Sequence, residues 1–534
     1  MTLYAWFVFF LLVQLIHGLG TWKLYEKAGR KSWEAFIPIY NSIVLMKIIN
    51  RPTWYTFLLF LPVINLIMFP VIWTETLRSF GKKSSVDTFL GIITLGFYIY
   101  YINYVEKVTY IENRSLVPAT KTGDTVSSLL FAVVVATFVH TYFLQPFTIP
   151  SASLEKSLLI GDFLFVSKIN YGARVPMTVV AAPMVHDTLP FVKIKSYLYD
   201  DTNKDSWKNK LQFPYLRLPA IETIKNNDIV VFNWPADTLY HMYKPADRRY
   251  DKPIDKRTNY VKRCVGIAGD SLQIKNGIVF INGKELILPE RARPQYSYKV
   301  ALEPTANIDF EYLFKDMDIT DGGTFTSEQR DTLLIFALPF DKVDRFKNIP
   351  GVKSITRVIH KGAEDGIFPD FKDGNASITN NWNNDNYGPI YIPKQGKTVV
   401  LNLQSLPFFR KIISEYEGND LKVVGNDIFV NDEKVSNYTF KQNYFWMMGD
   451  NRHNSLDARY FGFTPEDHIV GKPIFIWMSW DSNGKGLNKV RWDRVFTTVS
   501  GDGQPQSYFI YFLIALALYF GIDYLIKKRK DTNS

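Results

Sequence analysis

Two serines and one lysine are the residues of this sequence best suited to hydrolytic chemistry. Ser151 and Ser153 stand in the stretch TIPSASLEKSLLIGDFLFVSK, residues 148–168, directly after a long apolar run. A serine hydroxyl is a weak nucleophile at neutral pH and needs a base beside it. Lys262 lies inside the apolar stretch YVKRCVGIAGD, where a charged ammonium would be costly. Burial there would lower its pKa and let it act as that base.

A third stretch, GDNRHNSLDARYFG at residues 449–462, is a dense polar loop. Alone, each of the three stretches has an ordinary interpretation: a turn after a helix, a lysine that reaches outward from a strand, and a solvated loop. Together and in this order they resemble the sequence boxes of type I signal peptidases, the membrane-bound Ser/Lys endopeptidases that remove leader peptides. The resemblance covers residues 147–168, 228–270 and 449–471, and weakly residues 384–393.

The resemblance implies a role for each matching residue. Ser153 matches the nucleophile and Lys262 the general base. Ser151 matches the side-chain donor of the oxyanion hole, and Ser455 matches the hydroxyl that orients the lysine. The polar residues that support this corner of the site match Asp450, Arg452, Asp457 and Arg459. The residues of the shallow substrate pockets match Phe147, Ile149, Leu158, Tyr260 and Val261. The implied reaction is amide hydrolysis through an acyl-enzyme, with no cofactor and no metal.

The chain departs from the family's usual pattern around the nucleophile. Ala152 stands where glycine is usual, and Leu154 stands where methionine is usual. Glu155 and Lys156 follow where a proline is common. Leucine keeps the volume of methionine, and alanine is harmless unless that position needs a positive φ.

Apolar runs predict how these residues are positioned. Residues 125–144 carry no charged side chain and are long enough to cross a membrane as a helix. Pro146 and Pro150 would end that helix just before Ser151. Other apolar runs lie at residues 3–19, 54–74, 88–104 and 508–526. The run at 54–74 is interrupted by prolines, so it is either a kinked span or a re-entrant hairpin.

The distribution of lysine and arginine predicts the orientation. Basic residues follow the first run at 23–31, the third at 107–121 and the last at 527–530, and such clusters favour the cytoplasm. We therefore expect a multi-pass protein of the bacterial inner membrane, with its catalytic domain on the exterior, periplasmic face. Arg78, Lys82 and Lys83 do not follow this tendency.

Between the membrane segments, short runs of Val, Ile, Phe and Tyr bounded by Gly, Asn, Asp and Pro predict a mostly β fold. Residues 158–160 and 163–166 are expected to be strands, and residues 279–286 and 428–435 to be hairpins with Asn-Gly and Asn-Asp turns. The expected domains are a multi-span membrane region at 1–122, a transmembrane helix at 123–146, an exported catalytic β domain at 147–504 with an inserted subdomain at 287–425, and a transmembrane helix with a basic tail at 505–534.

The net charge of +10 is spread through loops and terminal tracts, without a basic stripe interleaved with aromatics. It indicates membrane-flanking charge, with lipid and not nucleic acid as the partner. The expected substrates are exported preproteins with small residues one and three positions before the cleaved bond, as in A-x-A. The single cysteine, Cys264, lies in the apolar strand, so it is expected to be a small buried residue.

Three alternatives remain open on sequence alone. The first is a Ser-His-Asp hydrolase that uses His453. The second is a self-cleaving Ser/Lys peptidase of the repressor type, whose members are soluble, unlike a chain with several apolar helices. The third is a non-enzymatic envelope protein whose β domain binds partners, which predicts an unreactive Ser153.

Overall fold

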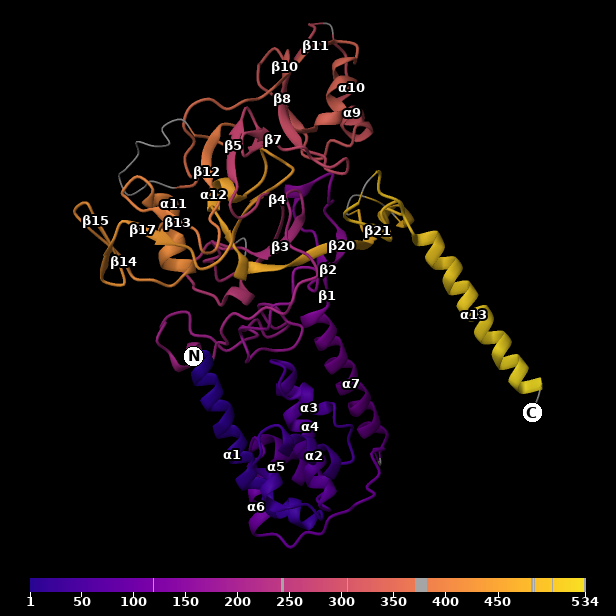
Figure 1. Cartoon of the computed structure of the whole chain (residues 1–534). Coiled ribbons are helices and arrows are strands. Elements are labelled where there is room, and N and C mark those ends of the chain that lie inside the picture. The colour runs from indigo at the N-terminus through magenta and orange to yellow at the C-terminus, as the bar shows by residue number, and fades with distance from the viewer. Residues whose placement is uncertain are drawn as a thin grey trace. The chain divides into compact units, whose positions relative to one another are not determined.

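The computed structural model describes residues 1–118, 120–241, 244–304, 306–369, 382–481, 484, 486–501 and 503–532 (Figure 1). These residues form two compact units. Unit 1 contains Met1–Leu144, Ala173–Leu218 and Asp237–Arg257, and unit 2 contains Gln145–Gly172, Pro219–Ala236 and Thr258–Ser534. Two pieces of the expected catalytic domain, 173–218 and 237–257, therefore fold within unit 1.

Unit 1 is helical, and its core is formed by buried apolar residues such as Leu24, Val44, Ile64 and Ile102. Its helices are α1 (Leu3–Lys27), α2 (Tyr40–Ile48), α3 (Tyr55–Leu58), α4 (Ile64–Ser79), α5 (Ser85–Ile93), α6 (Tyr98–Tyr104), α7 (Lys121–Tyr142) and the short α8 (Trp207–Lys210). Only α1 and α7 of these described helices are each long and apolar enough to cross a membrane alone.

The two middle apolar runs are broken. Residues 54–74 contain the whole of α3, a turn at Pro62 and the start of α4, so they are not one helix. The run at 88–104 consists of α5 and α6, which bend by 115° and together form a broken span or a re-entrant pair. Leu95 and Gly96 at the bend both have a positive φ. A Cβ on Gly96 would lie 2.6 Å from the Trp73 ring, so glycine is needed there.

The loops 173–218 and 237–257 pack together through polar contacts. The Asp255 carboxylate accepts hydrogen bonds from the Thr178 backbone and hydroxyl at 2.9 and 2.6 Å. Trp6 of α1 donates its indole N–H to the carbonyl oxygen of Gln212 at 3.2 Å, which ties these loops to the first helix.

Unit 2 is rich in β-structure. Its main sheet has the strand order β1-β2-β20-β3-β4-β18-β19, with β21 paired to β20. The strands are β1 (Leu144–Thr148), β2 (Asp162–Ser167), β3 (Ile229–Asn233), β4 (Asn259–Gly266), β18 (Tyr444–Met448), β19 (Thr464–Pro465), β20 (Ile469–Ser479) and β21 (Thr497–Thr498). Val230 and Lys262 are partners in the antiparallel pair of β3 and β4.

The expected strand at residues 158–160 is wrong. The N–H of Leu158 donates to the Leu154 carbonyl at 2.8 Å, and the N–H of Leu159 donates to the Asp162 carboxylate at 2.8 Å. The segment is therefore a pair of turns, and only β2 is a strand. Gly161 ends it with φ of 87°, and a Cβ there would lie 2.0 Å from the Trp480 carbonyl oxygen.

Both expected hairpins are confirmed. β6 (Ile278–Ile281) turns into β7 (Lys284–Glu285) through Asn282 and Gly283, which both have a positive φ. β15 (Asp427–Val430) turns into β16 (Glu433–Val435) through Asn431 and Asp432, again both with a positive φ. The remaining strands of these sheets and of a small two-stranded ladder are β5 (Ser271–Lys275), β12 (Tyr387–Tyr391), β13 (Thr398–Val400), β14 (Leu421–Val424) and β17 (Asn437–Thr439).

A separate layer lies within the inserted region. Its four-stranded sheet has the order β11-β8-β10-β9. Its elements are β8 (Gln295–Leu302), α9 (Phe310–Asp316), β9 (Gly323–Phe325), β10 (Thr332–Pro339), α10 (Val343–Lys347) and β11 (Val352–Arg357). This inserted layer, residues 295–357, has its own apolar core around Val300, Ile335 and Phe346. Residues from β12 to α11 (Leu406–Lys411) pack instead into the largest core of unit 2.

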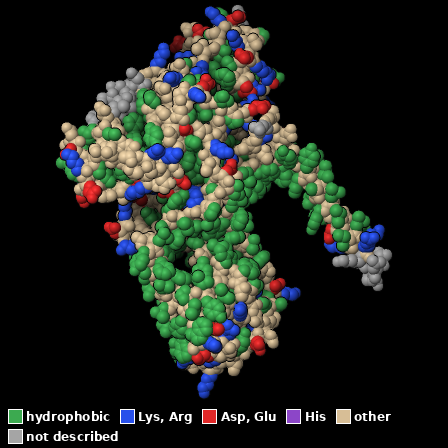
Figure 2. Space-filling view, in the orientation of Figure 1, with side chains coloured by type: hydrophobic (Ala, Val, Ile, Leu, Met, Phe, Trp, Pro, Cys, Tyr) green, Lys and Arg blue, Asp and Glu red, His purple; other side chains and the backbone are tan. Residues whose placement is uncertain are grey.

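The final helix, α13 (Phe509–Thr532), contains the third described segment long and apolar enough to cross a membrane, Phe509–Arg529. Figure 2 shows hydrophobic side chains along nearly its whole length and basic side chains near its end. The apolar run expected at residues 508–526 is therefore helical from Phe509 onward, and basic residues follow it.

Candidate active site

Ser153 lies in a single turn of 3-10 helix, Ala152–Leu154, between β1 and β2. Ser151 precedes the turn in an extended conformation and its side chain is exposed. Leu154 anchors the turn in an apolar cluster, with 1% of its surface exposed. Ala152 adopts the helical conformation of the turn, so the replacement of the family's glycine needs no positive φ.

Lys262 is buried on β4, and 4% of its surface is exposed. Its ammonium forms no ion pair with any residue that the structure describes, and it lies over the Tyr260 ring, with Nζ 5.5 Å from the centroid. Burial lowers the pKa of Lys262 to about 8, although Asp457 and Asp450 nearby favour its charged form. β4 also contacts the Ser153 turn. A buried amine of this kind is neutral in a useful fraction of molecules near neutral pH.

Gly449 joins the nucleophile turn to the polar loop. A Cβ built on it would lie 2.2 Å from the Ser455 hydroxyl oxygen and 2.5 Å from the Ser153 carbonyl oxygen. The next contact is made by Asn451, whose backbone N–H donates to the same Ser153 carbonyl at 3.1 Å. The start of the polar loop, directly after β18, therefore lies against both Ser153 and Ser455.

Asp457 and Arg459 form the buried frame of that loop. Asp457 caps α12 (Ala458–Phe461), and its carboxylate accepts from Arg459 Nε and Nη2 at 2.9 and 2.8 Å. It also accepts the backbone N–H of Gly449 at 3.0 Å. The Arg459 guanidinium donates further to the carbonyl oxygens of Arg452 and Asn384, at 2.7 and 3.1 Å. Arg459 lowers the pKa of Asp457, which is otherwise raised by burial, so this carboxyl is ionised.

A second buried ion pair was not foreseen from the sequence. Arg263 donates to the Asp450 carboxylate at 2.8 and 2.6 Å, and the Ser157 hydroxyl donates to it at 2.5 Å. Arg263 holds the pKa of Asp450 below its usual value against the effect of burial. The sequence did indicate that Arg263 faces away from Lys262, because the two residues are consecutive on a strand and side chains alternate along it. Lys262 and Arg263 therefore point to opposite faces.

Two predicted support residues have unsatisfied atoms. The Ser455 hydroxyl oxygen and the Arg452 Nε atom are buried without a hydrogen-bond partner among the described residues. Arg452 instead places Nη1 3.9 Å from the Met448 sulfur. Ser455 thus lies beside the Ser153 turn but makes no hydrogen bond to Lys262.

Four of the five predicted pocket residues share one apolar cluster. Ile149 and Leu158 are buried in it, and Phe147 and Val261 pack against it partly exposed. Tyr260 lies apart and stacks on Trp234, with ring centroids 5.0 Å apart and planes 4° apart. The cluster lies under the Ser153 turn, because it also contains Leu154.

His453, Asp385 and His360 form a cluster with the composition of a metal site. The Ser297 backbone N–H donates to His453 Nδ1 at 3.0 Å, so His453 Nε2 carries the hydrogen that it donates to Asp385 at 2.9 Å. Asp385 also accepts from His360 Nδ1 at 2.9 Å. His453 Nδ1 accepts from a backbone N–H and Nε2 donates to Asp385, so His453 has no free acceptor with which to serve as the base of a Ser-His-Asp hydrolase.

Comparison with known proteins agrees with the geometry of unit 2. A family described as "Signal peptidase, peptidase S26" matches residues 122–331 and 378–480, and a family of unknown function, DUF5684, matches residues 33–113. Signal peptidase I of Buchnera aphidicola subsp. Baizongia pistaciae is 23% identical over 373 residues, covering 70% of this chain and 82% of that protein. Signal peptidase I of Helicobacter pylori (strain ATCC 700392 / 26695) is 22% identical over 386 residues, covering 70% and 92%.

The signal peptidase match spans more than half of the chain and includes the Ser153 turn, β4 with Lys262, and the polar loop. A non-enzymatic binding protein is excluded by this match. The chain belongs to the signal peptidase family, peptidase S26, and is a membrane-associated serine endopeptidase that acts on exported preproteins.

Proposed function

We propose that Ser153 and Lys262 form the catalytic dyad of this signal peptidase. The observation that carries the proposal is the state of Lys262, an amine that is buried, free of carboxylate contacts among the described residues, and lowered in pKa to about 8. Its strand contacts the turn that bears Ser153. A lysine can serve as a general base only when such an environment makes it neutral.

In the proposed reaction, neutral Lys262 takes the proton of the Ser153 hydroxyl as the serine oxygen attacks the scissile carbonyl. The Ser151 hydroxyl and a backbone N–H near Ser153 donate to the oxyanion. The Lys262 ammonium then protonates the departing amine of the mature protein, which leaves the signal peptide esterified to Ser153. A water molecule, deprotonated by Lys262, hydrolyses that ester and restores both groups.

The polar loop holds this arrangement in place. Asp457 fixes Gly449, and Gly449 leaves room for both Ser153 and Ser455. We assign Ser455 as the hydroxyl that orients Lys262 when substrate is bound, because its oxygen is buried without a described partner. The remaining polar residues, Asp450, Arg452 and Arg459, support the loop and do not touch substrate.

The pocket residues favour small substrate side chains. Phe147 and Val261 are the partly exposed members of the apolar cluster under the Ser153 turn, with Ile149 and Leu158 buried behind them. Because the cluster is filled by its own side chains, the surface above it is shallow. A large substrate side chain would overlap with that surface and be rejected. We propose cleavage after small residues at the first and third positions before the bond. Processing of a preprotein with Phe immediately before the bond at the rate of one with Ala would contradict this.

The helices α1, α7 and α13, together with the bent pair α5–α6, anchor the chain as a multi-pass protein of the bacterial inner membrane. Lysine and arginine clusters after α1 and at the end of α13 favour a cytoplasmic location for these ends and a periplasmic location for residues 147–504. Protease added to spheroplasts should digest that region. Its protection in intact spheroplasts would contradict the orientation.

The direct test of the activity uses the full chain in proteoliposomes with a radiolabelled preprotein. Wild-type protein should release the signal peptide, and Ser153→Ala should release none above background. Normal processing by Ser153→Ala would overturn the dyad and leave the family membership intact.

A further inference from the structure

Lys156 stands where type I signal peptidases commonly have proline, three residues after Ser153, and the structure gives it a partner. Its side chain is 8% exposed, and its ammonium lies 2.8 Å from a carboxylate oxygen of Asp318 and 3.5 Å from Glu155. Asp318 follows α9 in the inserted layer, 162 positions later in the chain. The inserted layer therefore reaches the nucleophile turn through an ion pair whose cation is largely buried.

Asp321 of the same segment makes a second link. Its carboxylate accepts hydrogen bonds from the side-chain amides of Asn451 and Asn454 at 2.8 and 3.0 Å. The same Asn451 amide donates to the Ala152 carbonyl at 3.3 Å, and the Asn451 backbone N–H donates to the Ser153 carbonyl at 3.1 Å. One side-chain amide thus joins Asp321 to the turn that carries Ser153.

The two links lie on either side of the nucleophile. Asp318 pairs with Lys156, which follows Ser153 in the chain. Asp321 acts through Asn451 on Ala152, which precedes Ser153. Without Asp318, the Lys156 ammonium would be left largely buried with only Glu155 beside it. Residue 156 has a φ of 71°, which an L residue rarely adopts, so surrounding contacts must maintain the conformation of this turn.

We propose that the segment 318–321 of the inserted layer positions the nucleophile, with Asp318 and Asp321 as positioning residues that present Ser153 to Lys262. Neither carboxylate touches the reacting atoms. This inference rests on the proposed role of Ser153, and it gives the inserted layer a part in catalysis.

The test measures kcat and KM for preprotein cleavage by the full chain in detergent. Asp321→Ala, Asp321→Asn and Lys156→Ala should lower kcat by about tenfold to a hundredfold, with KM nearly unchanged, because a small displacement of a reacting group has effects of that order. The matched control is Asp316→Ala, which breaks an exposed ion pair with Arg345 in the same layer. It should leave kcat unchanged.

Rescue separates positioning from simple loss of folding. Exchanging the charges in the double variant Lys156→Asp, Asp318→Lys should recover much of the kcat lost in either single variant. Full activity in Asp321→Ala and Lys156→Ala, or no recovery in the exchanged pair, would overturn the inference. Ser153→Ala is run beside them, because an active Ser153→Ala enzyme would refute the proposed nucleophile itself.

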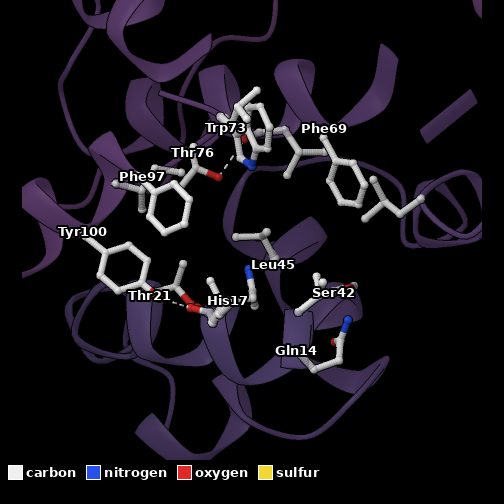
Figure 3. A pocket seen from close by; sticks show the side chains of 18 of the residues that line it. Gln14, His17, Thr21, Ser42, Leu45, Phe69, Trp73, Thr76, Phe97 and Tyr100 are labelled. Atoms are coloured by element: carbon white, nitrogen blue, oxygen red, sulfur yellow. Dashed lines mark hydrogen bonds between the residues drawn. The ribbon is translucent and has the colours of Figure 1, made fainter. Parts of the chain in front are cut away.

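A different observation concerns the helical unit. A cavity of about 230 Å³ lies among α1, α2, α4 and α6, mostly within the segment that matches the family of unknown function. Figure 3 shows Gln14, His17 and Thr21 along one side and Trp73 and Phe69 on the opposite side, with Phe97 and Tyr100 at one end. Polar side chains inside a membrane segment commonly mark a binding site or pathway.

Two polar side chains of α1 that line the cavity, Gln14 and His17, offer it a donor and an acceptor. Gln14 is 8% exposed, and its carbonyl oxygen accepts from Asn41 at 2.9 Å, while its amide nitrogen has no acceptor among the described residues. Tyr25 donates its hydroxyl hydrogen to the Asn41 carbonyl at 2.7 Å, so His17 Nε2 is the donor in its 3.3 Å contact with Tyr25. His17 Nδ1 is then an acceptor.

The geometry points to a binding site for a neutral membrane amphiphile that carries a hydroxyl group. The hydroxyl accepts from the Gln14 amide and donates to His17 Nδ1, and the apolar chain lies along the aromatic side chains. An amide N–H without an acceptor costs free energy in this apolar setting. A ligand hydroxyl can accept from Gln14 and donate to His17 at the same time, and so satisfies both side chains.

The probe is a long-chain alcohol bearing a diazirine, photolysed with the full chain in nanodiscs. Label should appear in peptides from α1, α4 and α6 and should fall about tenfold with excess 1-hexadecanol, but not with hexadecyl methyl ether, which lacks the donor. Gln14→Leu and His17→Phe should lose the label. Leu15→Phe, on the exposed side of the same helix, should retain it. Equal labelling in all variants, or equal competition by the ether, would overturn the site.

Discussion

The backbone N–H of Asn451 donates a 3.1 Å hydrogen bond to the carbonyl oxygen of Ser153. This bond connects two segments almost 300 residues apart in the chain, the turn with the proposed nucleophile and the polar loop after β18. The loop is held in turn by the buried pair of Asp457 and Arg459. Ser153 is therefore positioned by contacts from outside its own turn.

The tight approach at Gly449 predicts the effect of adding one methyl group. Gly449→Ala would bring a Cβ within 2.5 Å of the Ser153 carbonyl oxygen and 2.2 Å of the Ser455 hydroxyl oxygen, so the turn or the loop must shift. We expect kcat to fall by about a hundredfold. Gly521→Ala is the control, since nothing lies within 4 Å of its Cβ position, and it should cleave at the wild-type rate. Wild-type turnover by Gly449→Ala would show that this contact does not position the nucleophile.

The lowered pKa of Lys262 predicts the pH profile of cleavage. Below its pKa of about 8 the lysine is mostly protonated, so the neutral fraction should rise about tenfold per pH unit and then level off above pH 8. The rate of acylation should follow the same curve. A rate that is flat between pH 6 and 8 would mean that another group is the base.

The two serines of the nucleophile turn should differ in their effects. Ser151→Ala removes one oxyanion donor and leaves the nucleophile, which typically costs about 10²–10³ in rate. Ser153→Ala should be inactive. Preprotein cleavage by the two variants at equal concentration measures the difference, and the reverse order would mean that the two roles are exchanged.

The buried pair of Arg263 and Asp450 should contribute to stability more than to chemistry. Asp450→Asn leaves the Arg263 guanidinium, 3% exposed, without its carboxylate, a change that typically costs about 3–5 kcal/mol. Chemical denaturation followed by tryptophan fluorescence should show this loss. Arg345→Ala, which breaks an exposed pair, should leave the unfolding midpoint almost unchanged. Equal midpoints for the two variants would contradict the assignment.

Local patterns were sufficient where the deciding interactions were local. Asn282-Gly283 and Asn431-Asp432 adopt the positive φ values that a two-residue hairpin turn needs, so both hairpins followed from sequence. The apolar strand around Lys262 likewise predicted its burial. The long apolar helices α1, α7 and α13 were recognisable for the same reason, since their composition is uniform along the chain.

One of the misses comes from hydrogen bonds within a few residues, and the other two come from long-range contacts. Residues 158–160 look like a strand by composition, but the Asp162 carboxylate and the Leu154 carbonyl hold them as turns. The pairing of Arg263 with Asp450 joins two boxes that are far apart in sequence. Likewise, the partner of Lys156 lies in the inserted layer, and no local pattern indicates that Asp318 reaches the nucleophile turn.

The most direct measurement is covalent labelling of the full chain with a serine-reactive acylating inhibitor, read by mass spectrometry of the digested protein. We predict a single acyl group on the peptide that contains Ser153, absent in Ser153→Ala. In Lys262→Arg, which keeps the charge but cannot lose its proton in this pH range, labelling should be almost as slow as background. An acyl group on another serine in the wild-type protein, or labelling of Lys262→Arg at the wild-type rate, would contradict the Ser153/Lys262 dyad.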